Sequence, residues 1–135
     1  CKRTGQKEPE DIGSIVRLVM ESLAMKYRSS VEGLEKITGR NIPVLHIVGG
    51  GCKNKILSRY TANVLNRTVT AGPVEATAIG NVLAQLIALK EISDVNQARD
   101  VVKRSFPTEV YEPEATGIWE DAYSRYLQII ENPVG

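Results

Sequence analysis

Cysteine and histidine are scarce in this chain. Its 135 residues include two cysteines, Cys1 and Cys52, and one histidine, His46. The two cysteines lie far apart and have no metal-ligand spacing, and there is a single histidine, which argues against a zinc site and against a disulfide-stapled fold. So few cysteines favour a reducing, cytoplasmic setting.

An excess of charge of one sign is also missing. Seventeen Lys and Arg residues oppose sixteen Asp and Glu residues, which leaves a formal net charge of +1. Without a run of like charges, we expect no nucleic-acid partner and no acidic membrane surface as a partner. No apolar run approaches the roughly 18 to 20 residues of a membrane span. The polar start lacks a signal-peptide core, and because position 1 is Cys rather than Met we expect a piece cut from a longer protein.

Helical patterns dominate what is present. A 42% hydrophobic fraction is enough for one packed core. A 3.6-residue apolar period predicts a long helix from Pro9 to Gly39, with Gly39 as its C-terminal stop. Further helices are predicted just after residue 54, over about 75–89, from a Ser93 N-cap to about 105, and around Trp119 to Ile130.

Two short segments have the composition of β-strands. The apolar run 42–48 predicts a strand buried on both faces, with His46 as a hydrogen-bonded core residue. Residues 68–70 are all β-branched and predict a second strand, and residues 110–113 are extended. Strands that alternate with helices predict an α/β fold with parallel pairing. Two strands make a thin sheet, so either strands are missing or the helices pack heavily on each other.

A run of three glycines follows the first predicted strand. Gly49, Gly50 and Gly51 lead through Cys52 into a predicted helix. Backbone N–H groups at a helix N-terminus, with no Cβ atoms in the way, form a site for a phosphate or another anion. The run matches neither a Walker A loop nor a dinucleotide fingerprint. A tight turn that needs small residues for packing explains the same pattern, and both interpretations stay open.

The segment AGPVEATAIGN at residues 71–81 is a second dense motif. By itself it predicts a turn and a helix start, with Glu75 complementing the helix dipole. Small residues recur every four positions along this helix and let another element approach closely. They are Ala76, Gly80, Ala84 and Ala88.

Three blocks together carry a resemblance to a known family. They are ESLAMKYR at 21–28, HIVGGGCKN at 46–54 and AGPVEATAIGN at 71–81. In this order and spacing, across about residues 1–113, the chain resembles the FGGY carbohydrate kinases. The glycine turn alone indicates only the wider sugar-kinase group. The other two blocks indicate the branch of this family that acts on L-rhamnulose.

The resemblance implies a fold and a reaction. The fold is a partial ribonuclease-H-like domain of the actin-like ATPases, with a short parallel sheet flanked by helices. Residues 1–135 would be the C-terminal portion of the family's nucleotide-binding domain, without the N-terminal sugar-binding domain. ATP with Mg²⁺ would donate its γ-phosphoryl group to the 1-hydroxyl of L-rhamnulose. The implied partners are therefore ATP or ADP and a sugar that the absent domain holds.

The resemblance also implies which residues lie at the nucleotide. Gly50 and Gly51 would face the phosphates, and Asn54 or Lys55 would lie near the adenine. The full set of implied cofactor-binding residues is Gly49, Gly50, Gly51, Cys52, Asn54 and Lys55. Relatives often have Ser or Ala in place of Cys52, a change that leaves a backbone contact intact. No metal ligand is implied here, and no catalytic residue, because the family's catalytic aspartate precedes the matching segment. We therefore expect this piece alone to be inactive.

Other functions fit parts of the pattern. Another FGGY kinase, acting on xylulose, fuculose or glycerol, would share the glycine turn. A non-catalytic α/β interaction module would use that turn for packing alone, and a non-sugar actin-like ATPase is a third alternative. Apolar faces that lose a neighbouring domain are also compatible with self-association into a homo-oligomer.

Overall fold

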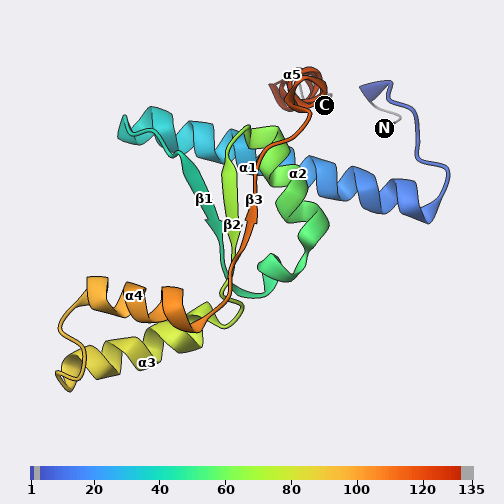
Figure 1. Cartoon of the computed structure of the whole chain (residues 1–135). Helices are drawn as coiled ribbons and strands as arrows, with labels where there is room; N and C mark the ends of the chain where they lie inside the picture. Colours follow the sequence, from blue (N-terminus) through green and yellow to red (C-terminus); the bar gives the residue numbers. More distant parts are fainter. Residues whose placement is uncertain (2–3, 132–135) are drawn as a thin grey trace.

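The computed structural model describes residue 1 and residues 4–131 (Figure 1). Helices and strands alternate along the chain, which confirms the predicted α/β class. In chain order the elements are α1 (Ile12–Thr38), β1 (Val44–Ile47), the 3₁₀ turn η2 (Gly49–Lys53), α2 (Lys55–Leu65), β2 (Thr68–Ala71), α3 (Ala76–Ala88), α4 (Val95–Ser105), β3 (Glu109–Tyr111) and α5 (Thr116–Glu131).

The long helix α1 ends at Gly39, as its sequence predicts, but it begins at Ile12, three residues after the predicted start at Pro9. The Asp11 carboxylate accepts a hydrogen bond from the Ser14 N–H at 2.9 Å and caps the N-terminus. At the other end Gly39 has a left-handed φ of 65° and donates its N–H to the Glu35 carbonyl at 2.8 Å. Local capping chemistry therefore fixes both ends of α1.

Helix α4 begins one residue later than its pattern predicts. Asp94 is the N-cap, since its Oδ1 accepts from the N–H groups of Asn96 at 2.7 Å and Gln97 at 2.9 Å. Ser93 lies outside the helix and donates its own N–H to the Gln97 side chain at 2.6 Å. The prediction of Ser93 as N-cap is wrong because the adjacent carboxylate makes the stronger, charge-assisted cap.

The sheet has three strands in the order β1-β2-β3. The predicted parallel pair is confirmed, with Val44 opposite Thr68 and Ile47 opposite Ala71. The extended segment near residue 110 adds a third strand, β3, which runs antiparallel to β2 and places Tyr111 opposite Val69. The sheet is therefore mixed, with β2 in its centre.

Strand β1 is not buried on both faces, and the expectation for His46 is wrong. His46 is exposed, and Val110 on the same face of the sheet is 58% exposed. The opposite face, with Val69 and Ala71, packs against α2 and is buried. Successive side chains of a strand point to opposite faces of the sheet. Within the described residues only the face toward α2 is covered, so His46 on the other face is exposed.

Two apolar clusters hold the fold together, and α2 contributes to both. The first lies where α1, α2 and α5 meet, and its buried members are Ala24, Met25, Leu57, Val64 and Tyr123. The second lies between the sheet and the η2–α2 segment, and its buried members are Cys52, Ala62, Val69, Ala71 and Tyr111. Helix α2 is therefore the central element of the packing.

Helices α3 and α4 lie side by side beyond the end of the sheet, away from α1 and α5 (Figure 1). Helix α3 has no buried residue. A Cβ atom added at Gly80, within the row of small residues, would meet nothing within 4 Å. Gly80, Ala84 and Ala88 of that row are exposed, so no described element covers this part of α3.

The chain exposes much apolar surface. Its accessible surface is 9358 Å², whereas a compact monomer of 14.8 kDa would expose about 7,000 Å². Part of the excess lies on the N-terminal half of α1, where Ile12 is 82% exposed, and on α3, where Val82 is 56% exposed. Self-association through these faces stays a prediction. No described helix is long and apolar enough to span a membrane.

Candidate functional site

The three glycines lie at the carboxyl end of β1 and form a turn of their own, η2. Gly49 has a φ of 75°, a conformation that favours glycine. Gly50 and Gly51 are exposed. A Cβ atom at Gly50 would meet nothing within 4 Å, and one at Gly51 would lie 3.8 Å from the Ile47 side chain. Another molecule can therefore approach the backbone of this turn closely.

The start of α2 is partly closed by the chain itself. The Asn54 side chain accepts from the Leu57 N–H at 3.0 Å and donates to the Met20 sulfur at 3.3 Å. One N–H group at the positive end of α2 is thus already satisfied, and α1 holds the capping side chain in place. The sequence pattern predicts exposed N–H groups at the start of α2, whereas the exposed backbone is that of η2, which precedes α2.

The motif at residues 71–81 meets the glycine turn at the carboxyl ends of β1 and β2. The Gly72 N–H donates to the Ile47 carbonyl at 2.8 Å, and the Gly49 N–H donates to the Pro73 carbonyl at 3.0 Å. We call this pair of hydrogen bonds the backbone clamp. It joins the motifs at residues 46–54 and 71–81, which are separate in the sequence.

Cys52 points away from the exposed face of the turn. Its side chain is buried in the second apolar cluster with Ala62 and Val69, so only its backbone borders the site. Cys52 and Cys1 are both free thiols. The role of Cys52 within the described structure is to anchor the end of η2 in the core.

Lys55 is the first residue of α2 and pairs with β3. Its ammonium is 2.6 Å from Glu109 Oε1, and the Tyr111 hydroxyl donates to the other oxygen of the same carboxylate. The hydrogen bond with Glu109 raises the pKa of Lys55, and the hydrogen bonds from Lys55 and Tyr111 lower the pKa of Glu109. These three residues border a shallow depression of about 480 Å³ that Ile56, Arg59 and Tyr60 complete. Sequence reasoning missed Glu109 and Tyr111, because no local pattern links them to a lysine 54 positions away.

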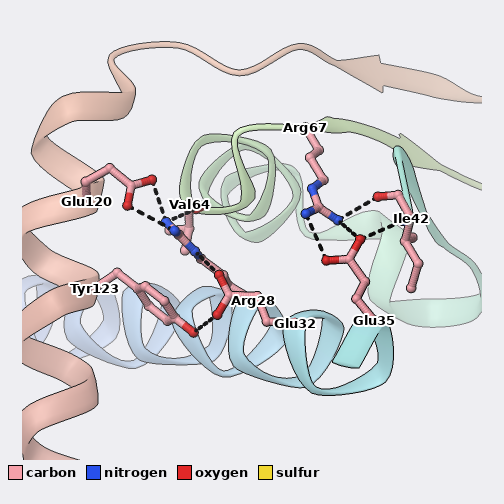
Figure 2. Close-up of polar contacts among 8 residues, drawn as sticks. All are labelled: Arg28, Glu32, Glu35, Ile42, Val64, Arg67, Glu120 and Tyr123. Atoms are coloured by element: carbon pink, nitrogen blue, oxygen red, sulfur yellow. Dashed lines mark hydrogen bonds and ion pairs between the residues drawn. The ribbon is translucent and has the colours of Figure 1, made fainter. Parts of the chain in front are cut away.

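The block at residues 21–28 lies elsewhere and ties helices together (Figure 2). The Arg28 guanidinium donates to Glu120 on α5 at 2.7 and 2.9 Å, to Glu32 at 2.8 Å and to the Val64 carbonyl at the end of α2 at 2.9 Å. Its central carbon lies 4.1 Å from the centre of the Tyr123 ring. Arg28 therefore joins α1, α2 and α5 in one polar contact.

Tyr123 completes this contact from α5. Its hydroxyl donates to Glu32 at 2.7 Å. Burial and the neighbouring Glu32 carboxylate raise the pKa of Tyr123 far above its ordinary value. Burial disfavours the charged form of Glu32, but hydrogen bonds from Arg28 and Tyr123 outweigh it and lower the pKa of Glu32.

A second arginine fixes the entry to the sheet (Figure 2). Arg67 binds both oxygens of Glu35 at 2.7 and 3.0 Å and donates to the Ile42 carbonyl at 2.7 Å. The same carboxylate accepts the Ile42 N–H at 2.6 Å. Hydrogen bonds from Arg67 and Ile42 lower the pKa of Glu35. The end of α1 is thus fixed against the starts of β1 and β2.

Comparison with known proteins assigns the chain to a family. Residues 1–89 match the C-terminal domain of the FGGY family of carbohydrate kinases. The chain belongs to this family. The η2 segment and Arg28 both lie within the matched residues.

Relatives and a solved structure support the same conclusion. The chain is 44% identical over 130 residues to a rhamnulokinase of Bacteroides thetaiotaomicron, covering 96% of this chain and 27% of the relative. It is 46% identical over 114 residues to a rhamnulokinase of Enterococcus faecalis, covering 83% of this chain and 23% of the relative. The chain thus spans about a quarter of the length of these relatives.

The fold is similar to that of the xylulose kinase from Rhodospirillum rubrum. The TM-score is 0.70 at 21% identity, over 95% of this chain and 26% of that protein. This likeness confirms the expected α/β fold, because the chain folds like part of that kinase.

Proposed function

We propose that this chain is the C-terminal, nucleotide-binding part of a kinase that transfers the γ-phosphoryl group of ATP to L-rhamnulose, giving L-rhamnulose 1-phosphate. The observation that carries the proposal is the 44% identity to a rhamnulokinase over 130 residues. The identity extends past the glycine turn to nearly the whole chain. It therefore includes the two blocks, 21–28 and 71–81, that point to L-rhamnulose rather than xylulose, fuculose or glycerol.

The residues of η2 suit the phosphates of a nucleotide. Gly50 and Gly51 offer exposed backbone with no side chain in the way. Lys55 follows the turn, pairs with Glu109 and would lie near the adenine. Gly49 and Cys52 would shape the turn through their backbone. Asn54 would act as a helix cap beside the nucleotide rather than as a contact to the adenine, since both of its side-chain groups are engaged.

Magnesium would come with the nucleotide. The described residues contain no group of three or more His, Cys, Asp or Glu side chains that could hold a metal ion. Mg²⁺ is commonly held by phosphate oxygens, waters and one or two carboxylates, and it neutralises charge that develops on the transferred phosphoryl group. In this chain the glycine turn would orient the phosphates, while the sugar and the catalytic base would be held by another part of the protein. We place this activity in the cytoplasm, where free Cys1 and Cys52 thiols persist.

The test is a kinase assay of a longer protein that carries this sequence. We expect L-rhamnulose to be phosphorylated in preference to xylulose, fuculose and glycerol, with ADP release as the readout. Gly50→Val should raise the KM for ATP at least tenfold, because a branched side chain would fill the open face of the turn. Gly80→Val is the matched control, since Gly80 is equally open but lies on α3.

The outcomes separate the alternatives. A preference for another sugar would assign the chain to a different FGGY branch. Absence of both nucleotide binding and sugar phosphorylation would favour a non-catalytic interaction module. Equal effects of the two valine substitutions would show that the glycine turn is not the nucleotide site.

A further inference from the structure

The glycines of η2 carry no side chains that could hold this turn in one conformation. Glycines have the largest conformational freedom of any residue, and Gly50 presents no side chain and has nothing near its Cβ position. A phosphate site built from backbone must nevertheless be held in place before the ligand arrives. The chain must therefore fix η2 from outside.

The far end of η2 is fixed by side chains. Cys52 is buried in the second apolar cluster, and Asn54 caps α2 while contacting Met20 of α1. The near end is held less closely by side chains, because Val48 is 53% exposed and Ile47, the last residue of β1, is only half-buried against the same cluster. The backbone clamp adds a direct restraint at this end, in which Gly72 donates to Ile47 and Gly49 donates to Pro73.

Position 72 admits no side chain without a shift of its neighbours. Gly72 is buried and has a φ of 118°, which other residues rarely adopt. A Cβ atom there would lie 3.1 Å from the Pro107 carbonyl oxygen and 3.5 Å from a Thr108 methyl carbon. The segment before β3 therefore lies close to Gly72, whereas the Gly72 N–H hydrogen bond is made to Ile47 at the end of β1, on the other side of β2. Glycine at 72 lets three segments, from β1, β2 and β3, meet at one point.

We propose that Gly72 is a positioning residue for the nucleotide turn. It contacts no ligand, and it sets the position of Gly49, Gly50 and Gly51 by holding the end of β1 through the backbone clamp. This role rests on the proposed function of η2 as a phosphate site. It gives the motif at 71–81 a physical link to the motif at 46–54.

The test compares Gly72→Ala with Gly33→Ala in the 135-residue chain. Gly33 is the matched control, because it lies within α1 at an ordinary φ with nothing within 4 Å of its Cβ position. In the ligand-free protein we expect Gly72→Ala to shift the amide resonances of 49–51 and to speed hydrogen exchange of the Gly49 amide at least tenfold. The amides of α1 and α5 should stay unchanged, and MgADP should bind at least tenfold more weakly. Gly33→Ala should leave all of these readouts unchanged.

A merely structural role for Gly72 predicts a different pattern. It would lower the melting temperature and leave the Gly49 exchange rate and the MgADP affinity of the folded protein as they were, and that result would overturn the proposal. If Gly72→Ala does not fold, the unsubstituted chain provides the test. There the Gly49 amide should exchange at least tenfold more slowly than the Gly50 amide, and equal rates would refute the clamp.

Failure of the proposed function looks different. If the unsubstituted chain binds no MgADP, the assignment of η2 as a nucleotide site preformed in this chain fails, while the exchange rates of Gly49 still decide whether the clamp holds the turn. If the unsubstituted chain binds MgADP and Gly72→Ala binds it equally well, the nucleotide assignment stands and the positioning role is lost.

Discussion

Replacing Arg28 with alanine tests the structural assignment of the block at 21–28. The substitution removes the hydrogen bonds to Glu120, Glu32 and the Val64 carbonyl, and the contact with the Tyr123 ring. The Arg28 side chain is 16% exposed and its partner Glu120 is 51% exposed. The inward contacts should therefore carry most of the energy.

The magnitude follows from those inward contacts. A carbonyl that loses its partner, here that of Val64, costs about 1–3 kcal/mol. The contact with the Tyr123 ring adds about 0.5–2 kcal/mol, and the partly exposed pairs with Glu32 and Glu120 add less than about 1 kcal/mol each. We expect Arg28→Ala to lower the free energy of unfolding by about 3 kcal/mol.

Urea unfolding followed by circular dichroism measures this loss. Arg17→Ala is the matched control, because Arg17 is 70% exposed and pairs with Glu21 on the surface of α1, and such helix pairs contribute only about 0.3–0.5 kcal/mol. A loss below about 1 kcal/mol for Arg28→Ala, or equal losses for the two variants, would refute the reasoning from burial and hydrogen bonding.

Three further predictions concern pH, capping and local stability. Arg67 lowers the pKa of Glu35, so the contribution of this pair to stability is present above the ordinary glutamate pKa and is lost as the pH falls through the lower folded value. The urea midpoint of unfolding should therefore drop below about pH 4.5, and Glu35→Gln should flatten that part of the pH profile. Asn54→Ala should cost about 1 kcal/mol in urea unfolding, whereas Asn54→Asp, which keeps the cap, should cost less; equal costs would contradict the capping role. Because α3 has no buried residue, its amides should exchange with deuterium at least tenfold faster than those of α2, and equal protection would contradict this account of the packing.

The parts of the fold that sequence predicts are those decided locally. Asp11 and Gly39 cap α1 through groups a few residues away, and the apolar period of the helix is visible within the same window. The parallel strands follow from short apolar and β-branched runs. Ser and Asp both cap helices well, so the sequence pattern fits either Ser93 or Asp94, and the charge-assisted cap of Asp94 decides where α4 begins.

The parts that sequence does not predict depend on distant partners. Lys55 finds Glu109 and Arg28 finds Glu120 only after the chain has folded. His46 was expected in the core because an apolar strand suggests cover on both faces, whereas the described residues cover only one. The glycine turn is visible in the sequence, but the clamp that connects it to Gly72 is not.

Direct binding of nucleotide to η2 is the measurement that tests the central claim. The 135-residue chain, labelled with ¹⁵N, would be titrated with MgADP while its backbone amides are followed by NMR. The account predicts saturable shifts centred on residues 49–55, with little change in the amides around Arg28. Saturation with shifts centred elsewhere, or no shifts at millimolar MgADP, would contradict the assignment of the glycine turn as a nucleotide site preformed in this chain.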